Sequence, residues 1–439
     1  MVGTIRILKQ FMPCADLITT IQCGEYLSRT FGLRVVRNKV FSFKSYSLYY
    51  SMKSSLDLIR CVIYRVMKHH LSLNLRWLIE NRKLKEWANA DVIIHLGGDV
   101  LSDYLGQTNL LEHLKDLLLG VVLEKPVVIW GESVGPIRSR FCRFLAKFVL
   151  NKVAMITLRE EASKVYLCNI GIHKPPIYVT ADPAFLCQAA PKVRVKEILD
   201  MEGLDDMAGP LIGITPSVLS LLRRMSNFSA CMFSLYSTFQ YFLPEELFRL
   251  IVGKVKRLPI FQREKVELNN MLKVLAEVAD GCIENLNANV VLIPHVQAGG
   301  PYANDKELAM KVVHLMKHGN RAQVIRHNYT AEEIGGIIGC LHLLIGSRMH
   351  ANIAALSQCI PVIALPYHGK FHNVMVMVGQ ERYVCDEVTT EAIMAKLSEV
   401  WNRRQAIREQ LEYRVRNMKE LALSQGKLVR EMLYNISNC

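Results

Sequence analysis

The feature that most restricts the fold is an alternation that begins near residue 91 and continues to about residue 370. Short apolar runs are each followed by a glycine-containing or polar loop and then by a longer amphipathic segment. Strands that alternate with helices of about ten residues favour βαβ units and a parallel sheet, so the sequence predicts an α/β protein. The predicted strands are residues 92–96, 126–130, 154–158, 177–179, 211–216, 290–293, 324–326, 341–345 and 361–365.

The predicted strands fall into two groups, separated by a charged stretch at about residues 188–210. A chain of 439 residues is long enough for two domains that each have a core. We therefore predict two Rossmann-like domains that face a cleft. The predicted N-terminal domain is residues 1–205, with a strand at 5–8, a helix at 17–31 and a basic helical insertion at about 35–86. The predicted C-terminal domain is residues 206–385. Residues 386–439 are predicted to form a helix that packs back toward the N-terminal domain.

Several common site types and locations are disfavoured. The glycine patterns of dinucleotide sites and P-loops do not occur. No apolar run is long enough to span a bilayer, and Lys9 and Asp16 interrupt the first apolar stretch before a signal-peptide core develops. The twelve cysteines are scattered without a CxxC pair, which is typical of reduced thiols. We expect a cytoplasmic protein, with membrane association as a further option.

The net charge of +14 indicates an anionic partner, which is nucleic acid, a membrane surface or an acidic substrate. Basic residues concentrate between Arg34 and Lys85, with tyrosine, phenylalanine and tryptophan among them. This mixture suits base stacking, a membrane interface or simply a solvated helical face. The aromatic segment between Ser217 and Leu243 is likewise compatible with a lid, an interfacial anchor or packed core.

The turn from Gly346 to His350 is the strongest single indication of a ligand site. It lies between the predicted strand 341–345 and a predicted helix that begins near Ala351, so it presents Arg348 and His350 together at a helix N-terminus. Free N–H groups and the helix dipole at that position favour a phosphate or carboxylate. The alternative is that Arg348 forms a salt bridge and His350 belongs to the core.

Other predicted strands also end in glycine or polar residues, and ligands of parallel α/β sheets bind at the carboxyl ends of strands. The motifs are Leu96 to Asp99, Gly131 to Pro136, Leu158 to Glu160, Asp182 to Ala184, Pro294-His295 and Pro366 to Lys370.

In their order, these motifs and Ser347 to His350 resemble the polysaccharide pyruvyl transferase family over residues 91–370. The resemblance implies an architecture like that of B-type glycosyltransferases. It also implies transfer of the enolpyruvyl group of phosphoenolpyruvate to a sugar of a cell-surface polysaccharide or its precursor, which gives a pyruvate ketal and phosphate. The chain departs from the family at Glu132, where glutamine is more usual, at its first loop, and in the basic insertion.

The resemblance also implies roles for individual residues. Catalysis is assigned to Arg348 and to His350, as general acid or base, with His295 as the competing candidate. Donor binding, in the C-terminal domain and from the facing one, is assigned to Arg159, Arg348, Lys370 and Ser347. Acceptor binding is assigned to Gly97, Gly98, Asp99, Glu132, Ser133 and His295.

We expect no cofactor and no metal, because the chemistry requires neither and no metal-ligand spacing occurs. The expected partners are phosphoenolpyruvate, a sugar or lipid-linked oligosaccharide acceptor and an anionic membrane at the periphery, but no nucleic acid. Two alternatives stay open. One is a nucleotide-sugar glycosyltransferase of the same architecture, with Arg348 and Lys370 on a diphosphate. The other is a non-enzymatic membrane- or nucleic-acid-binding protein that uses residues 34–85.

Overall fold

A computed structural model describes ten segments of the chain. They are residues 1–19, 24–35, 48–73, 75–103, 106–205, 207, 209–217, 259–296, 305–366 and 369–438. The aromatic segment between Ser217 and Leu243 lies outside them. Among the helices of these segments, none combines the length and apolar character that a bilayer crossing requires.

The N-terminal domain is built on a four-stranded parallel sheet in the order β3-β4-β5-β6. The strands are β3 (Ile93–Leu96), β4 (Val127–Glu132), β5 (Met155–Leu158) and β6 (Ile177–Val179), and the helices between them are α5 (Gln107–Val122), α6 (Arg140–Leu150) and α7 (Glu161–Asn169). Alternate residues of β4 enter different cores, as the two-residue period of a strand requires. Val127 and Ile129 pack against α5 and α6, whereas Val128 and Trp130 pack against the terminal helices.

The C-terminal domain contains a five-stranded parallel sheet in the order β11-β10-β7-β8-β9. Its strands are β7 (Leu211–Thr215), β8 (Asn289–Leu292), β9 (Ala322–Val324), β10 (Leu343–Gly346) and β11 (Val362–Ala364). Its helices are α12 (Pro259–Leu286), α13 (Asp305–Leu315), α14 (Ala331–Gly339), α15 (Met349–Leu356) and α16 (Lys370–Met377). Strands β8 and β10 are buried along their whole length, and β7 is buried after its first residue, which explains their nearly continuous apolar sequences.

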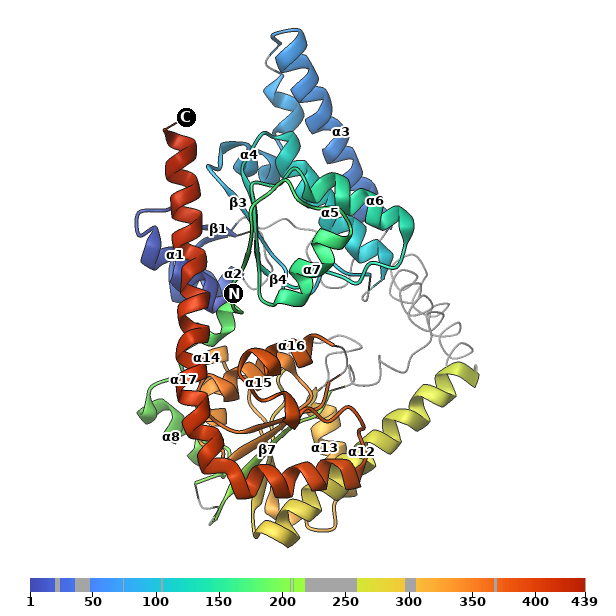
Figure 1. The fold of residues 1–439 in the computed structure, drawn as a ribbon, viewed down its shortest axis with the longest axis vertical. Helices are drawn as coiled ribbons and strands as arrows, with labels where there is room; N and C mark the ends of the chain where they lie inside the picture. Colours follow the sequence, from blue (N-terminus) through green and yellow to red (C-terminus); the bar gives the residue numbers. More distant parts are fainter. Residues whose placement is uncertain are drawn as a thin grey trace.

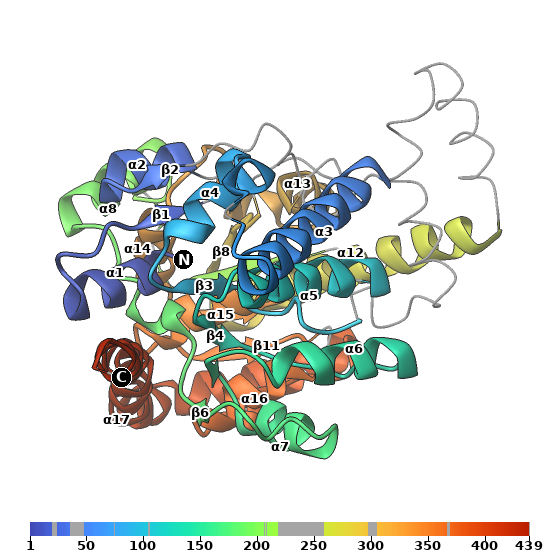
Figure 2. The ribbon, with the colours of Figure 1, turned by 90° about the horizontal axis from the view of Figure 1, so that it is seen from above.

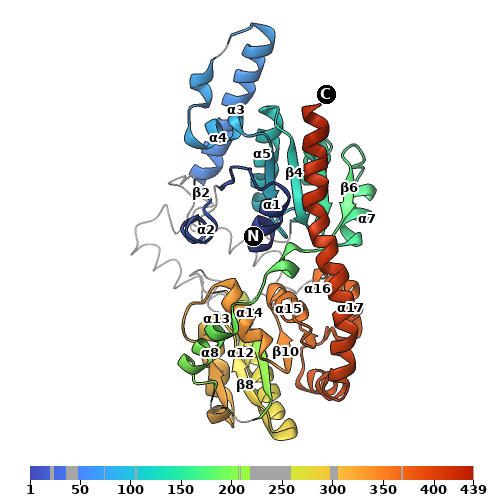
Figure 3. The same cartoon turned by 90° about the vertical axis from the view of Figure 1, so that its left-hand side faces the viewer.

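The last helix, α17 (Thr390–Ser437), runs along both domains (Figures 1 and 3). Its first half packs in the C-terminal core through residues such as Ile407 and Leu411, and Val429 lies in the core beneath β4. There α17 crosses α1 (Val2–Phe11) at Gly426, where an added Cβ would lie 2.5 Å from Ile7. A single helix therefore contributes to the packing of both domains.

The connection between the domains runs from β6 through the 3-10 helix η2 (Pro183–Leu186) and helix α8 (Lys192–Met201). Gln425 of α17 is fully buried beside this connection: its amide donates to the Ala181 carbonyl (2.9 Å) and accepts from Thr157 Oγ1 (3.0 Å). These bonds fix the backbone immediately before Asp182.

The α/β prediction is confirmed, and each of the nine predicted strands overlaps an observed strand, although the predicted strand 324–326 shares only Val324 with β9. The predicted strand at 5–8 is wrong, because these residues belong to helix α1. Ile7 packs toward Trp130 and Ile5 toward Leu27, so α1 is buried on two sides, and such a short apolar run does not distinguish helix from strand. The predicted helix 17–31 is replaced by β1 (Ile18–Thr19), which pairs with β2 (Arg34–Val35), and by α2 (Gly24–Phe31).

The basic region contains α3 (Leu48–His70), the 3-10 helix η1 (Arg76–Ile79) and α4 (Arg82–Asn89). Helix α3 packs on α5, with Cys61 in a small core that includes Leu119 and Leu123. The region is therefore attached to the N-terminal domain by an apolar contact.

Candidate active site

The carboxyl ends of the two sheets meet between the domains. Asp182 follows β6 of the N-terminal domain, and His350 lies in the first turn of α15 in the C-terminal domain. Asp182 Oδ2 is 3.9 Å from His350 Nε2. Side chains that are distant in sequence thus form one cluster at the edge where ligands of such sheets bind.

Arg159, at the end of β5, is the centre of the N-terminal half of the cluster. The residue is 2% exposed; its Nη1 donates to Asp182 Oδ2 at 2.7 Å and its Nε donates to Ser133 Oγ at 2.6 Å. Ser133 donates in turn to Glu160, whose carboxylate is 3.6 Å from Arg159 Nε. Burial lowers the pKa of Arg159, but Asp182 and Glu160 more than offset this and raise it. Arg159 is therefore a permanent, closely packed cation.

Glu132, the last residue of β4, is fully buried and holds the loop that follows β3. Its carboxylate accepts from the backbone N–H of Gly98 (2.9 Å) and of Val100 (3.1 Å). A Cβ on Gly97 would lie 2.1 Å from Glu132 Oε2, so this position requires glycine. Burial raises the pKa of Glu132 to about 7, against the opposing influence of Arg159 and the two N–H groups. The Glu132 carboxylate therefore holds the Gly97-Gly98 loop in place.

Arg348 forms the corresponding cation of the C-terminal half. It lies at the N-cap of α15 and is 6% exposed. Its Nε and Nη2 donate to the two oxygens of Asp305, at 3.0 and 2.5 Å, and Asp305 Oδ2 also accepts from the Val296 N–H. Asp305 is fully buried, so this is a bidentate ion pair within one domain.

His350 is the cluster member that solvent reaches most easily, since 55% of its side chain is exposed. Desolvation lowers its pKa, Asp182 acts in the opposite direction, and Arg159 adds to the decrease. The neutral imidazole therefore dominates at neutral pH, and it can accept a proton.

His295, which follows β8, lies near His350 and Arg348. It is buried more deeply, and burial lowers its pKa to about 3, with further lowering by His350 and Arg348. It therefore stays neutral at any ordinary pH. Among the described residues no partner lies within hydrogen-bond distance of His295 Nδ1 or of Arg159 Nη2, although both atoms are buried. Unpaired buried polar atoms are costly, and at a cluster like this one they indicate where ligand atoms would bind.

The remaining predicted site residues have the following positions. Ser347 is buried, and its N–H donates to Thr215 Oγ1 at 3.0 Å. Asp99 follows Gly98 and is half-buried. Lys370 begins α16, and its side chain lies outside the described part of the structure. The cluster thus unites Arg159, Ser133, His295, Arg348 and His350, whereas the roles of all predicted site residues stay predictions.

Three cluster residues were absent from the predicted site. Asp182 occurs in a predicted motif, but sequence alone did not show that it joins Arg159 to His350. Glu160 occurs in the same motif as Arg159, but the sequence does not show that its carboxylate is buried against both Arg159 and Ser133. Asp305 stands at the start of a predicted helix, and nothing in the local sequence distinguishes it from an ordinary helix-start carboxylate.

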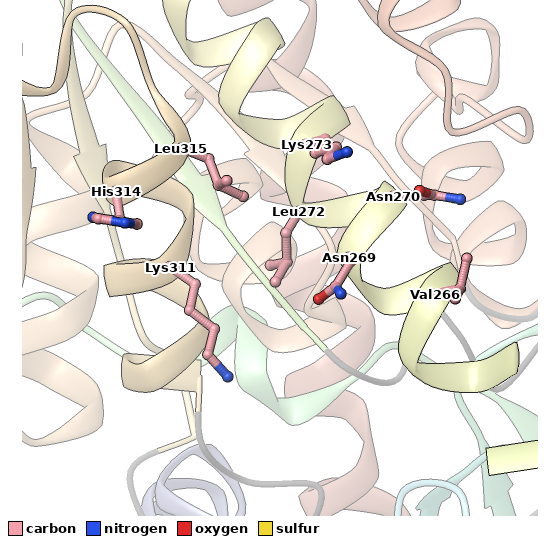
Figure 4. A pocket seen from close by; sticks show the side chains of 8 residues that line it. All are labelled: Val266, Asn269, Asn270, Leu272, Lys273, Lys311, His314 and Leu315. Carbon is pink, nitrogen blue, oxygen red and sulfur yellow. The ribbon is translucent and has the colours of Figure 1, made fainter. Parts of the chain in front are cut away.

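A separate hollow of about 440 Å³ lies on the outer side of the C-terminal domain (Figure 4). Its lining comes from α12 and α13: Val266, Asn269, Asn270, Leu272, Lys273, Lys311, His314 and Leu315. None of these side chains belongs to the interdomain cluster, so the two features are distinct. Within the described segments, no group of three or more histidine, cysteine or acidic side chains has the arrangement of a metal site.

Comparisons with known proteins place these observations in a wider context. A family model described as polysaccharide pyruvyl transferase matches residues 33–369. The amylovoran biosynthesis protein AmsJ of Erwinia amylovora is 24% identical over 357 residues, which are 81% of this chain and 74% of AmsJ.

Solved structures show the fold. HepE of Anabaena in complex with UDP and glucose aligns with a TM-score of 0.54 at 11% identity, over 99% of this chain and 95% of that one. S. aureus MnaA with UDP aligns with a TM-score of 0.57 at 11% identity, over 100% and 93%. The predicted two-domain architecture of the glycosyltransferase B type is thereby confirmed.

Proposed function

Because the chain belongs to the polysaccharide pyruvyl transferase family, we propose that it transfers the enolpyruvyl group of phosphoenolpyruvate to a sugar of a cell-surface polysaccharide or its precursor. The product is a pyruvate ketal, and phosphate is released. The observation that carries this proposal is the contact of Asp182 with His350, which joins Arg159 of one domain to a partly exposed imidazole of the other.

The donor carries a carboxylate and a phosphate, so it needs cations from more than one direction. We assign the carboxylate to the unpaired Nη2 of Arg159. This atom is shielded in the observed conformation, so binding requires the cluster to open at the Asp182–His350 contact. We assign the phosphate to the C-terminal half, to Arg348 and the N-terminus of α15, with Lys370 as a further predicted cation.

The proton balance gives His350 a defined task. Its neutral imidazole takes the proton of the first sugar hydroxyl and gives it to the methylene carbon of the donor, which becomes the methyl group. This protonation makes C2 resemble an oxocarbenium ion, and the oxygen of the same hydroxyl bonds to C2. A second hydroxyl displaces phosphate from C2, and its proton leaves with the phosphate. General acid–base catalysis of this kind contributes about 10²–10⁴-fold.

The test is phosphate release from phosphoenolpyruvate, screened over candidate sugars and lipid-linked oligosaccharides, with the ketal product identified by mass spectrometry and NMR. We expect release that depends on one acceptor class and a product heavier by one pyruvyl group. Turnover of a nucleotide-sugar donor without turnover of phosphoenolpyruvate would instead identify a glycosyltransferase of the same fold.

A further inference from the structure

Helix α6 exposes a row of phenylalanines on the side opposite its core contacts. Phe141, Phe144 and Phe148 are 62%, 66% and 49% exposed, although the side chains of Cys142 and Ala146 on the other side are fully buried. The spacing of three and four residues places the three rings on one face of the helix. We call these three residues the phenylalanine ridge.

Single exposed apolar residues are normal on a protein surface, but a contiguous aromatic patch is typical of an interaction site. None of the three rings belongs to the buried core that α6 forms with the sheet. The ridge also lies away from the interdomain cluster, because α6 begins beyond the β4 loop and packs on the outer side of the sheet. A function other than catalysis is therefore needed to account for it.

Within its own segment of the chain, the ridge has charged neighbours of one sign; across the fold, Asp103 accepts from the backbone N–H groups of Arg138 and Ser139 at the start of α6. Residues 137–153 contain five basic residues and no acidic one: Arg138, Arg140, Arg143, Lys147 and Lys152. Lys152 Nζ lies 4.8 Å from the centre of the Phe148 ring, so cation and aromatic ring are already adjacent. On a helical projection, Arg140, Arg143 and Lys147 flank the ridge along one side.

A second helix of the same domain has a similar surface. Helix α5 lies between α3 and α6 and packs against both (Figures 1 and 2). On α3, the exposed apolar residues Leu56, Ile59, Ile63 and Val66 are 43–53% exposed. Arg60, Arg65 and Lys68 lie among them. Two helices of one layer thus combine exposed apolar side chains with basic ones.

We propose that α6 docks the enzyme on an anionic membrane surface, with the phenylalanine ridge at the boundary between headgroups and acyl chains. Arg140, Arg143 and Lys147 then bind lipid phosphates, and α3 extends the contact. An aromatic face beside a purely basic one is the pattern of a helix that lies in a membrane interface. A protein partner would not require the absence of acidic residues along the whole helix.

This inference goes beyond the proposed function and does not depend on the donor chemistry. It does narrow the acceptor class, since an enzyme bound to a membrane surface meets lipid-linked sugars at high local concentration. A lipid-linked acceptor and a docked enzyme both diffuse along the same membrane surface, so they meet more often than they would in solution.

The test uses the full-length protein in vesicle co-sedimentation, without substrates. We expect binding to vesicles that contain phosphatidylglycerol, little binding to phosphatidylcholine alone, and loss of binding as salt is raised. The triple variant F141A/F144A/F148A should lower the partition coefficient by at least about a hundredfold, because three aromatic side chains lose their burial in the interface. The matched control is Y413A/Y434A, which removes two exposed aromatic rings from α17 and should bind like the parent.

A charge variant separates the two contributions. R140Q/R143Q/K147Q should weaken binding to the anionic vesicles and flatten its salt dependence. All variants should keep the parent's melting temperature and its phosphate release with a soluble acceptor, so failure of the membrane proposal is distinguishable from failure of the pyruvyl transfer. Equal vesicle binding by parent and F141A/F144A/F148A would overturn the proposal. The proposal would also be overturned if the parent did not bind the vesicles and instead formed a dimer that F141A/F144A/F148A converted to a monomer.

Discussion

The two halves of the interdomain cluster each contain a buried arginine paired with a carboxylate, but only one of the two pairs also contacts the facing domain. Arg348 is closed on Asp305 by two hydrogen bonds within the C-terminal domain. Arg159 shares Asp182 with His350 of the facing domain, and its Nη2 has no partner among the described residues. The C-terminal pair is therefore complete within its own domain, whereas the N-terminal pair is open toward the site.

This difference suggests a structural role for the C-terminal pair and a role in ligand binding for the N-terminal pair. A complete buried pair holds the β10–α15 turn in place, and its loss leaves an uncompensated charge. An incomplete pair that reaches across the domains can respond to a ligand. Variants on the two sides should therefore fail in different ways.

The largest expected effect belongs to His350, where the two halves touch. His350→Ala should lower the rate of phosphate release by about 10²–10⁴-fold, because the proton carrier is lost while a largely exposed side chain leaves the fold intact. Turnover with the preferred acceptor and the melting temperature are the measurements. The control is His318→Ala, which removes an exposed histidine paired with Glu284 elsewhere in the domain. Normal turnover of His350→Ala would refute the assignment.

The complete pair is tested through Asp305. Asp305→Ala should destabilise the protein by about 3–5 kcal/mol, because buried Arg348 loses the carboxylate that holds it by two hydrogen bonds. Urea unfolding measures this change in the free energy of unfolding. The matched control is Glu307→Ala, whose surface pair with Lys311 is expected to contribute less than about 1 kcal/mol. Equal unfolding midpoints for the two variants would show that the Arg348 pair does not hold the turn.

Glu132, which holds the loop after β3 in the N-terminal half, should make the stability of the protein depend on pH. The folded pKa of Glu132 is about 7 against an ordinary value of 4.5, so the folded state binds more protons than the unfolded state between these values. The contribution of Glu132 to stability is therefore full below pH 4.5 and is lost as pH rises to about 7. The loss is on the order of 3 kcal/mol.

Glu132→Gln, which cannot titrate, should remove this component, so its stability relative to the parent should improve as pH rises through the same window. Its absolute stability should fall, because a glutamine amide cannot accept from both Gly98 and Val100. Parallel stability curves for parent and variant would contradict the raised pKa.

The smallest expected effect on catalysis is a shift of the pH–rate profile, and it comes from Asp182, which raises the pKa of His350 from 3.9 Å away. Asp182→Asn should also lower the stability, because buried Arg159 loses its nearest carboxylate. In Asp182→Asn the pKa of His350 should fall, and the acidic limb of the pH–rate profile should move to lower pH. The shift should be about one pH unit, at the low end of the range for an opposite charge about 4 Å away, because more than half of the His350 side chain is exposed to solvent. An unmoved limb beside a lower kcat would mean that Asp182 acts only by positioning.

Much of the architecture could be predicted from local sequence. The α/β class, the strands and the position of Arg348 and His350 at a strand–helix turn depend on periodicities and turn residues within a few positions. Helix α1 could not be predicted, because contacts with Trp130 and Leu27 decided its conformation. The functions of the Glu132 carboxylate and of the ridge on α6 required knowledge of burial.

The sequence by itself therefore determined the parallel sheets and the polar residues at their carboxyl ends, since both follow from the order of neighbouring residues. Only the tertiary structure decided how the charges are shared: Arg159 pairs with a carboxylate 23 positions away, Arg348 with one 43 positions away, and Asp182 reaches His350 in the other domain. The physical reason is that an ion pair depends on distance and burial in space, and neither is encoded by spacing along the chain.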